Sequence, residues 1–288
     1  MNYRHAFHAG NFADVFKHAL LVGLLESLRL KPAAFCYVDT HAGRAHYDLR
    51  GAEAARTREH VDGVQRLLDA PDLPAALERY VGVVREFDAG NAGTLARYPG
   101  SPAIAAALLR AQDRAILCEL HDEEVAALRN ALRGDARFAI HQRDGYAAMN
   151  ALLPPEQKRG VVLIDPPFEA QGAEYLQIQD ALGRALSRWP NAIYAVWYPI
   201  KLRETVAPFH RWLARHASSG DVLVAELLVH PDNSALRLNG CGIALVNPPW
   251  QFDRRLETWL PALAGLLAQS RHPDARNARI EWLKRESA

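Results

Sequence analysis

The most informative segment of the chain reads Val161-Val162-Leu163-Ile164-Asp165-Pro166-Pro167-Phe168. Its apolar run, 161–164, is continuous rather than alternating, which predicts a strand buried on both faces of a sheet. The two prolines that follow end the strand and restrict the backbone. A carboxylate, a carbonyl and an aromatic ring are thereby expected at the carboxyl end of a buried strand, where open α/β sheets bind their ligands.

Further apolar runs recur along the chain, and segments with helical periodicity separate most of them. We expect the other strands at 35–40, 115–120, 138–143, 192–198, 222–229 and 243–246, and helices at 11–29, 102–113, 121–133, 173–188 and 201–217. Alternation of this kind predicts a mostly parallel, doubly wound sheet. Asn239-Gly240 is a hairpin signal between the last two runs. The expected fold is therefore a Rossmann-like α/β fold with seven strands and a terminal antiparallel hairpin.

The interval between the first two expected strands is longer than one crossover helix requires. Residues 47–96 carry amphipathic helical patterns that are interrupted by prolines and glycines. We interpret them as a helical insert, so that 1–46 and 97–288 form the core domain.

The composition is that of an ordinary globular protein: 288 residues, 49% hydrophobic and 23% charged. A net charge of +1 provides no global attraction to nucleic acid, so a nucleic-acid substrate would need local basic patches. No apolar run approaches transmembrane length, and the N-terminus lacks the apolar core of a signal peptide. Cys36, Cys118 and Cys241 lie in strand-like runs and are expected to be buried, reduced thiols. These features predict a cytoplasmic protein that does not bind membranes.

Acidic residues lie at the carboxyl ends of the first four expected strands, in order: Asp39, Glu119, Asp144 and Asp165. In a doubly wound sheet these strand ends share one edge, and an acid after the second strand is the usual acceptor for ribose hydroxyls. Gly145, next to Asp144, lets the backbone approach a flat base closely. A single acid at a strand end is most often a helix N-cap, but four in order favour a nucleotide-like ligand.

The segment Asp165-Pro166-Pro167-Phe168 resembles the Asp-Pro-Pro-Tyr motif of amino-methylating enzymes that use S-adenosylmethionine. The loop 39–44 has a single glycine and is not a dinucleotide phosphate cradle, which disfavours a nicotinamide oxidoreductase. S-adenosylmethionine has no pyrophosphate and is compatible with this loop. A second motif, Asn247-Pro248-Pro249-Trp250, resembles the Asn-Pro-Pro-Tyr variant. We expect it not to be catalytic, because the run 243–246 should end a hairpin near the edge of the sheet.

The N-terminal stretch is rich in basic and aromatic residues ahead of a helix that is expected to start at Asn11. No acid or cysteine stands at metal-ligand spacing there, so we expect no metal site. A basic arm with Tyr3, Arg4, His5 and His8 is suited to contact phosphate or to stack on a base, and we expect these residues to contact a substrate RNA.

Together, these segments resemble the RlmJ family. The resemblance rests on 3–11 (Tyr-Arg-His-Ala-Phe-His-Ala-Gly-Asn), Lys17-His18, 39–43 (Asp-Thr-His-Ala-Gly), 98–102 (Tyr-Pro-Gly-Ser-Pro), Asp144-Gly145, 164–167 (Ile-Asp-Pro-Pro) and 247–250 (Asn-Pro-Pro-Trp). It extends from the N-terminus to about residue 260. The resemblance implies a class I methyltransferase core with a helical insert after the first strand. It also implies methylation of N6 of one adenosine in 23S ribosomal RNA by S-adenosylmethionine, with S-adenosylhomocysteine as the product.

The resemblance also implies roles for individual residues. Cofactor contacts would fall on Lys17, His18, His41, Ser101, Glu119, Asp144, Gly145 and Asp165. Asp165 would be catalytic and Tyr3 would lie on the substrate side. The chain departs from the usual motif at Phe168, where the ring needed for stacking is kept and the tyrosine hydroxyl is lost.

The expected mechanism is a direct in-line transfer. Asp165 and the Pro166 carbonyl accept the two amino hydrogens of adenine, while Phe168 stacks on the base. The base has to be unstacked, and we expect 23S rRNA that is deproteinised or at an early assembly stage, with the protein acting as a monomer. An adenine-N6 DNA methyltransferase is one alternative, disfavoured because a separate target-recognition domain is missing. A catalytically silent module that binds S-adenosylmethionine or RNA is another, raised only by Phe168.

Overall fold

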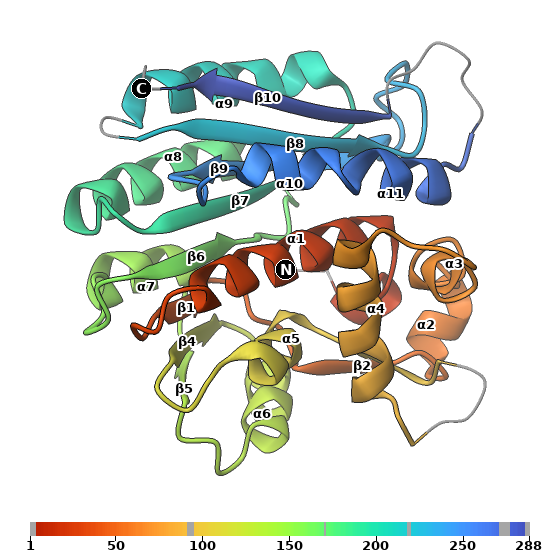
Figure 1. Ribbon diagram of the computed structural model, residues 1–288, viewed down its shortest axis with the longest axis horizontal. Helices are drawn as coiled ribbons and strands as arrows, with labels where there is room; N and C mark the ends of the chain where they lie inside the picture. The colour runs from red at the N-terminus through yellow and green to blue at the C-terminus, as the bar shows by residue number, and fades with distance from the viewer. Residues whose placement is uncertain (1–3, 91–94, 170, 218–219, 271–276, 286–288) are drawn as a thin grey trace.

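The computed structural model describes residues 4–90, 95–169, 171–217, 220–270 and 277–285. Its centre is an eight-stranded mixed sheet in the order β10-β8-β9-β7-β6-β1-β4-β5 (Figure 1). The strands are β1 (Cys36–Asp39), β4 (Arg114–Glu119), β5 (Phe138–Gln142), β6 (Gly160–Ile164), β7 (Ile193–Ile200), β8 (Val222–Leu228), β9 (Gly240–Val246) and β10 (Ala278–Lys284). Strands β1, β4, β5, β6 and β7 run parallel to one another, whereas β9 is antiparallel to both β7 and β8. The predicted fold class, a parallel core with an antiparallel hairpin, is confirmed.

The predicted number of strands is wrong by one, because β10 adds an antiparallel edge strand beside β8. In this strand Ala278, Ile280 and Trp282 alternate with Arg279 and Glu281, and its residues are mostly half-buried. Such alternation is typical of a strand with one face on the core and one toward solvent. A search for continuous apolar runs therefore passes over it.

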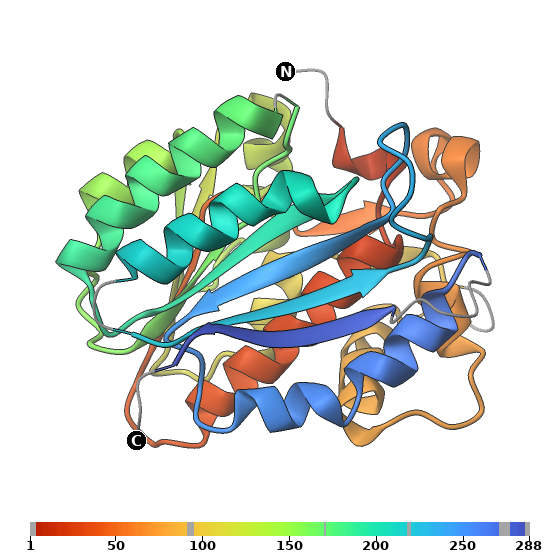
Figure 2. The ribbon, with the colours of Figure 1, turned by 90° about the horizontal axis from the view of Figure 1, so that it is seen from above.

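Helices cover both faces of the sheet (Figure 2). One face packs against α1 (Phe12–Arg29), α5 (Ser101–Leu108), α10 (Phe252–Glu257) and α11 (Leu260–Leu267). The other face packs against α7 (Gly145–Leu152), α8 (Gln171–Arg188) and α9 (Arg203–His216). A further helix, α6 (Asp122–Ala131), contacts β5. The sheet is thus buried between two apolar layers, which explains the continuous apolar runs of its central strands.

Helix α1 carries charged residues into the protein interior. Asn11 caps it, since its side-chain oxygen accepts hydrogen bonds from the backbone N–H groups of Ala13 and Asp14, both at 3.0 Å. Asp14 and Lys17 lie on the same side of the helix and are both buried. Buried charges are tolerated where they are paired, so this side of α1 marks a polar site within the core.

The region predicted to be a helical insert contains three helices, α2 (Ala52–Thr57), α3 (Val64–Leu68) and α4 (Ala75–Phe87). Two short antiparallel strands, β2 (His46–Asp48) and β3 (Arg97–Pro99), pair at the base of this region. Helix α4 packs against α1, and α2 contacts η1 (His5–Phe7), the 3₁₀ turn of the N-terminal arm. The division of the chain into a core and an insert stays a prediction.

All three cysteines are buried and free, as the sequence predicted. Within the described ranges, no helix is both long enough and apolar enough to cross a membrane.

Candidate active site

A cleft of about 940 Å³ opens at the carboxyl ends of the parallel strands. The strand order reverses direction at β1, which has β4 on one side and β6 on the other, and such a switch point is the usual ligand site of an open α/β sheet. Glu119, Asp144 and Asp165 all line the cleft: Glu119 is the last residue of β4, Asp144 lies two residues after β5, and Asp165 directly follows β6. The structure therefore brings three of the four predicted strand-end acids to one cavity.

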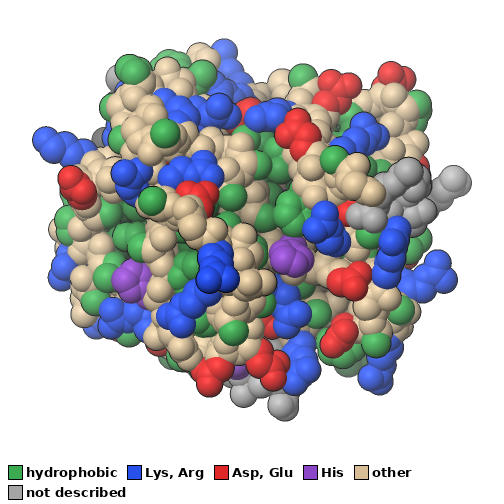
Figure 3. Space-filling view, turned by 90° about the horizontal axis from the view of Figure 1, so that it is seen from below, with side chains coloured by type: hydrophobic (Ala, Val, Ile, Leu, Met, Phe, Trp, Pro, Cys, Tyr) green, Lys and Arg blue, Asp and Glu red, His purple; other side chains and the backbone are tan. Residues whose placement is uncertain are grey.

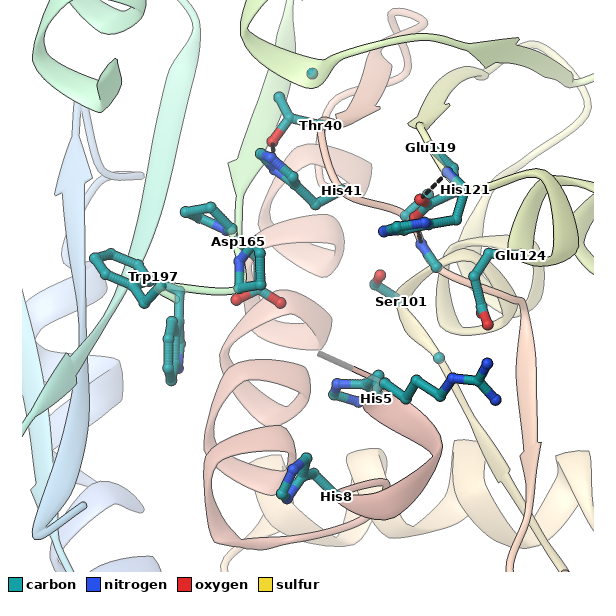
Figure 4. A pocket seen from close by; sticks show the side chains of 18 of the residues that line it. His5, His8, Thr40, His41, Ser101, Glu119, His121, Glu124, Asp165 and Trp197 are labelled. Carbon is teal, nitrogen blue, oxygen red and sulfur yellow. Dashed lines mark hydrogen bonds between the residues drawn. The ribbon is translucent and has the colours of Figure 1, made fainter. Parts of the chain in front are cut away.

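The catalytic loop predicted from sequence lies on one wall of this cleft (Figure 4). The Asp165 carboxylate accepts a hydrogen bond from the Lys17 ammonium, with 2.5 Å between Oδ2 and Nζ. Lys17 in turn lies 3.1 Å from Oδ1 of Asp14. One ammonium group thus joins two carboxylates and fixes the orientation of Asp165 relative to α1.

The ring of Phe168 is held by two other aromatic side chains. Tyr175 and Trp197 contact it edge to face, with ring centroids 5.3 and 5.6 Å away. Phe168 has a positive φ of 49°, a left-handed conformation that is uncommon for a bulky residue. The position of its ring is therefore set by packing, and the ring lines the cleft next to Pro166 and Pro167.

Glu119 is oriented by the backbone at the end of β4. Oε2 accepts from the N–H of Gly43 at 2.8 Å, and Oε1 accepts from those of Leu120 and His121 at 2.7 and 2.9 Å. Each carboxylate oxygen has two acceptor positions, so the group keeps capacity for a ligand hydroxyl. Figure 4 shows Glu119 and His121 across the cleft from Asp165 and Trp197.

Asp144 is the N-cap of α7 and accepts from the backbone N–H of Ala147 at 2.7 Å. Gly145 packs against Thr40, and a Cβ at this position would lie 2.1 Å from the Thr40 carbonyl oxygen. Glycine is therefore required to bring the loop after β5 close to the loop after β1. This packing role adds to the ligand role expected from the sequence.

Asp39, the first acid of the series, points into the protein instead of lining the wall. Its carboxylate is fully buried and accepts from the hydroxyl groups of Tyr37 at 2.6 Å and Ser101 at 2.7 Å. Burial raises the pKa of Asp39 to about 6, against the opposing effect of these two hydrogen bonds. Ser101, which does line the cleft, is thereby oriented by Asp39.

Two histidines predicted as cofactor contacts also line the cleft. The His18 ring shares a hydrogen bond with the hydroxyl of Tyr98 at 2.8 Å, and burial lowers the pKa of His18 to about 3. The His41 ring shares one with the Thr40 hydroxyl at 2.8 Å, and burial lowers its pKa as well. Both imidazoles are therefore neutral at neutral pH.

The described part of the N-terminal arm borders the same cleft through Arg4, His5 and His8, while Tyr3 lies outside the described residues. Nε2 of His5 lies 2.9 Å from Oδ2 of Asp14. The arm is thus connected to the same buried carboxylate that contacts Lys17.

Several lining or connecting residues were missed in the sequence. Asp14 precedes Lys17 by three positions on one helix, a spacing that could have identified the pair. Trp197 follows the β7 residue that pairs with Ile164, which brings it level with Asp165, but this depends on strand register. Thr40 and Lys201 also line the cleft, and no sequence pattern around either residue predicts this.

The second Pro-Pro motif lies elsewhere. The expectation that run 243–246 ends near the sheet edge is wrong, because β9 lies between β7 and β8. Val246 pairs with Tyr194, near the start of β7, since the two strands are antiparallel. Asn247 therefore lies at the opposite end of the strands from Asp165. None of residues 247–250 lines the cleft, and the expectation that this motif is not catalytic stays a prediction.

Among the described residues, no group of three or more His, Cys, Asp or Glu side chains is arranged to hold a metal ion.

The fold and the order of acids along the cleft define a class I methyltransferase-like protein. The family model described as "Ribosomal RNA large subunit methyltransferase D, RlmJ" matches residues 32–284. The chain belongs to this RlmJ family and is a homologue of the ribosomal RNA large subunit methyltransferases J, which are enzymes. The family predicted from the sequence is confirmed.

Two curated relatives carry the name ribosomal RNA large subunit methyltransferase J. The protein of Escherichia coli (strain K12) is 38% identical over 285 residues, which cover 98% of this chain and 99% of the relative. That of Haemophilus influenzae (strain ATCC 51907 / DSM 11121 / KW20 / Rd) is 37% identical over 287 residues, or 99% and 100% of the two chains. A crystal structure of a protein from Legionella pneumophila str. Philadelphia 1 superposes with a TM-score of 0.85 at 35% identity, covering 96% of this chain and 98% of that one.

Proposed function

We propose that the protein transfers a methyl group from S-adenosylmethionine to N6 of one adenosine in 23S ribosomal RNA. The observation that carries this proposal is the loop 165–168, which presents a carboxylate, a non-donating carbonyl and an aromatic ring to a cleft lined by strand-end acids. The names of the two curated relatives, which refer to large-subunit ribosomal RNA, support the substrate class.

The residues of the cleft fit the methyl donor. S-adenosylmethionine supplies a methyl group on a sulfonium centre. The oriented carboxylate of Glu119 is suited to accept from ribose hydroxyls, and the loop of Asp144 and Gly145 to border the donor's base. By the family resemblance, Lys17, His18, His41, Ser101 and Asp165 complete the contacts. Small-molecule sites commonly measure roughly 300–1,000 Å³, so the cleft has room for a donor and part of a second ligand.

Asp165 and Pro166 would hold the reacting amino group. The exocyclic nitrogen of adenine is a weak nucleophile because its lone pair is delocalised into the ring. Oδ2 of Asp165 faces Lys17, which leaves Oδ1 to accept one amino hydrogen while the Pro166 carbonyl accepts the other. These two hydrogen bonds draw the nitrogen toward tetrahedral geometry and orient its lone pair. The nitrogen gains the methyl group and loses one proton, for which Asp165 is the adjacent acceptor.

Phe168 would stack on the adenine once the base leaves its own stack in the RNA. Its ring is already oriented by Tyr175 and Trp197, so little conformational freedom is lost when the base binds. The missing tyrosine hydroxyl does not affect this role.

Recognition of the RNA would be local to the rim of the cleft. On the face in Figure 3, Lys and Arg side chains are interspersed with Asp and Glu, consistent with a net charge of +1. Arg4 and the two arm histidines, His5 and His8, border the cleft and are suited to phosphate or base contacts. We further propose that the substrate is deproteinised or early-assembly rRNA and that the protein acts as a cytoplasmic monomer.

A methyl-transfer assay tests the proposal. Purified protein is incubated with radiolabelled S-adenosylmethionine and, separately, deproteinised 23S rRNA, intact large subunits and duplex DNA. We expect label in the deproteinised rRNA, little in intact subunits and none in DNA. Label in duplex DNA but not in rRNA would overturn the proposal in favour of a DNA enzyme. Binding of the donor by calorimetry with no transfer to any RNA would favour the silent module.

A further inference from the structure

The helical insert encloses the junction between the N-terminal arm and α1. Residues 57–64 include the end of α2 and the start of α3. They pack along one side of residues 7–11. The hydroxyl of Thr57 donates a hydrogen bond to the carbonyl of Phe7. The backbone N–H of Val64 donates to the carbonyl of Gly10 at 2.9 Å. Hydrogen bonds from the insert thus hold the arm at two points, Phe7 and Gly10.

The fit between the two segments is close enough to require glycine on both sides. A Cβ on Gly63 would lie 2.0 Å from the Gly10 carbonyl oxygen. Gly10 has a φ of +76°, and a Cβ there would approach a methyl carbon of Val64 to 3.1 Å. Backbone packs directly on backbone here, so the position of residue 10 is set by the insert.

Glu59 makes the polar contacts of this junction. Its carboxylate accepts from the His8 ring at 3.0 Å and from the side-chain amide of Asn11 at 2.9 Å. The hydrogen bond and charge of Glu59 raise the pKa of His8, and the pair is half exposed. One carboxylate of the insert therefore holds a residue of the arm and the N-cap of α1 together.

These contacts connect the insert to the reacting groups. Asn11 caps the helix that carries Asp14 and Lys17, and Lys17 contacts Asp165. His5, in the 3₁₀ turn η1 of the arm, also contacts Asp14. Glu59 accepts from the side-chain nitrogen of Asn11, whereas the cap of α1 uses the side-chain oxygen, so loss of Glu59 would displace the arm at the rim of the cleft and leave the cap of α1 in place.

We propose that the helical insert is the anchor of the N-terminal arm, and that Glu59 is a positioning residue for RNA methylation. The inference rests on the proposed function, in which the arm lies on the substrate side. Glu59 does not line the cleft and acts through His8 and Asn11. Loss of its carboxylate should release the arm and weaken productive RNA binding, while the donor site, built mainly on the strand ends, stays intact.

The test compares Glu59→Ala with Glu78→Ala. Glu78 is an exposed acid on α4, in the same insert, and its replacement removes the same charge away from the arm. Four quantities are measured: hydrogen exchange of a peptide covering residues 4–11, KM for 23S rRNA, calorimetric affinity for S-adenosylmethionine, and the melting temperature. Glu59→Gln, which keeps hydrogen-bonding atoms without the charge, is expected to give an intermediate effect.

We expect faster exchange over residues 4–11 in Glu59→Ala and a KM for rRNA raised by roughly three- to tenfold, the range for one lost hydrogen-bonding group. Donor affinity should change less than twofold, and Glu78→Ala should match the wild type. Unchanged exchange, or faster exchange with an unchanged KM, would overturn the inference. Exchange is measured without RNA, so if the wild type methylates no rRNA, the proposed function fails while faster exchange still supports the anchor alone.

Discussion

Two loops of this protein share a Pro-Pro pair and a terminal aromatic residue, yet they lie at opposite ends of the sheet. The loop 165–168 follows β6 and borders the cleft, whereas 247–250 follows β9, which runs the other way. Both contain a residue with positive φ, Phe168 and Asn247. The positive φ falls on the last residue of the first loop and on the first residue of the second, so the two loops share a sequence pattern and not a backbone conformation. The direction of the preceding strand decides which of the two loops borders the cleft.

The partners of the two polar side chains differ in kind. Asp165 contacts the ammonium of Lys17, which is itself buried in the core side of α1. The side-chain amide of Asn247 donates to the carbonyls of Pro190 and Ala192 at 2.7 and 2.8 Å. The first side chain is held by a charge and has acceptor capacity left for a ligand. The second uses its amide group to connect the loop after β9 with the backbone before β7.

The aromatic residues differ in the same way. Phe168 is packed against two other rings beside the cleft. Trp250 is 83% exposed. Stacking on a base is favoured by a ring whose position is fixed before the base arrives. Of the two loops, only the first provides such a ring.

The largest expected effect comes from removing the acid of the first loop. Asp165→Ala should lower kcat for rRNA methylation by about 10²–10³-fold, the usual cost of losing one group that stabilises the reacting centre. Asn247→Ala, the matched change in the second loop, should leave kcat within twofold. Initial rates at saturating donor and rRNA measure both. Equal losses in the two variants would remove the distinction between the loops.

Asp39 lies at the same end of the strands as the first loop. Burial raises the pKa of its carboxyl group from 3.8 to about 6. Between these two pH values the folded protein binds more protons than the unfolded chain, so this group makes stability fall as pH rises. Asp39→Asn should remove that decline, which amounts to as much as about 3 kcal/mol at about 1.4 kcal/mol for each pH unit. Urea unfolding of both proteins at pH 4, 5, 6 and 7 measures it. Parallel stability profiles would contradict the raised pKa.

The next effect concerns the two rings. Phe168→Ala should weaken the binding of the target base by about 1–3 kcal/mol, the usual contribution of base stacking on an aromatic side chain. This loss corresponds to a KM for rRNA that is about five- to 150-fold higher. Trp250→Ala should leave KM unchanged. Steady-state kinetics with rRNA varied at a fixed donor concentration compare them. A raised KM in Trp250→Ala would place RNA on the opposite edge of the sheet.

The smallest effect is structural. Asn247→Ala should lower the free energy of unfolding by about 1–3 kcal/mol, because two backbone carbonyls lose their donor. A second contact adds to this expectation, since a Cβ on Gly220 would lie 1.8 Å from Oδ1 of Asn247. Denaturant unfolding is the measurement. A variant as stable as the wild type would show that the second loop has no structural role either.

Much of the site could be predicted from the sequence because it depends on local order along the chain. The continuous run before Asp165 predicts a buried parallel strand. Glu119 ends β4 and Asp144 comes shortly after β5, both of which are also parallel strands, although β5 is only partly buried. All three reach one cleft because parallel strands end at one edge.

The rest depends on which segments meet in space. Asp39 lies at the end of its strand, as Glu119 does, but its side chain turns inward to Ser101, a partner 62 positions away. Glu59 meets Asn11 across 48 positions, and no local pattern marks either contact. The position of β9 between β7 and β8 depends on the order of the strands in the sheet, which hydrophobic periodicity does not predict.

The most direct test of the difference between the loops is to identify the methylated nucleoside. Deproteinised 23S rRNA is treated with wild-type protein, Asp165→Asn or Asn247→Ala, digested to nucleosides and analysed by mass spectrometry. N6-methyladenosine should form with the wild type and with Asn247→Ala, and should be absent or strongly reduced with Asp165→Asn. A different methylated nucleoside, or N6-methyladenosine formed undiminished by Asp165→Asn, would contradict the assignment of the catalytic loop.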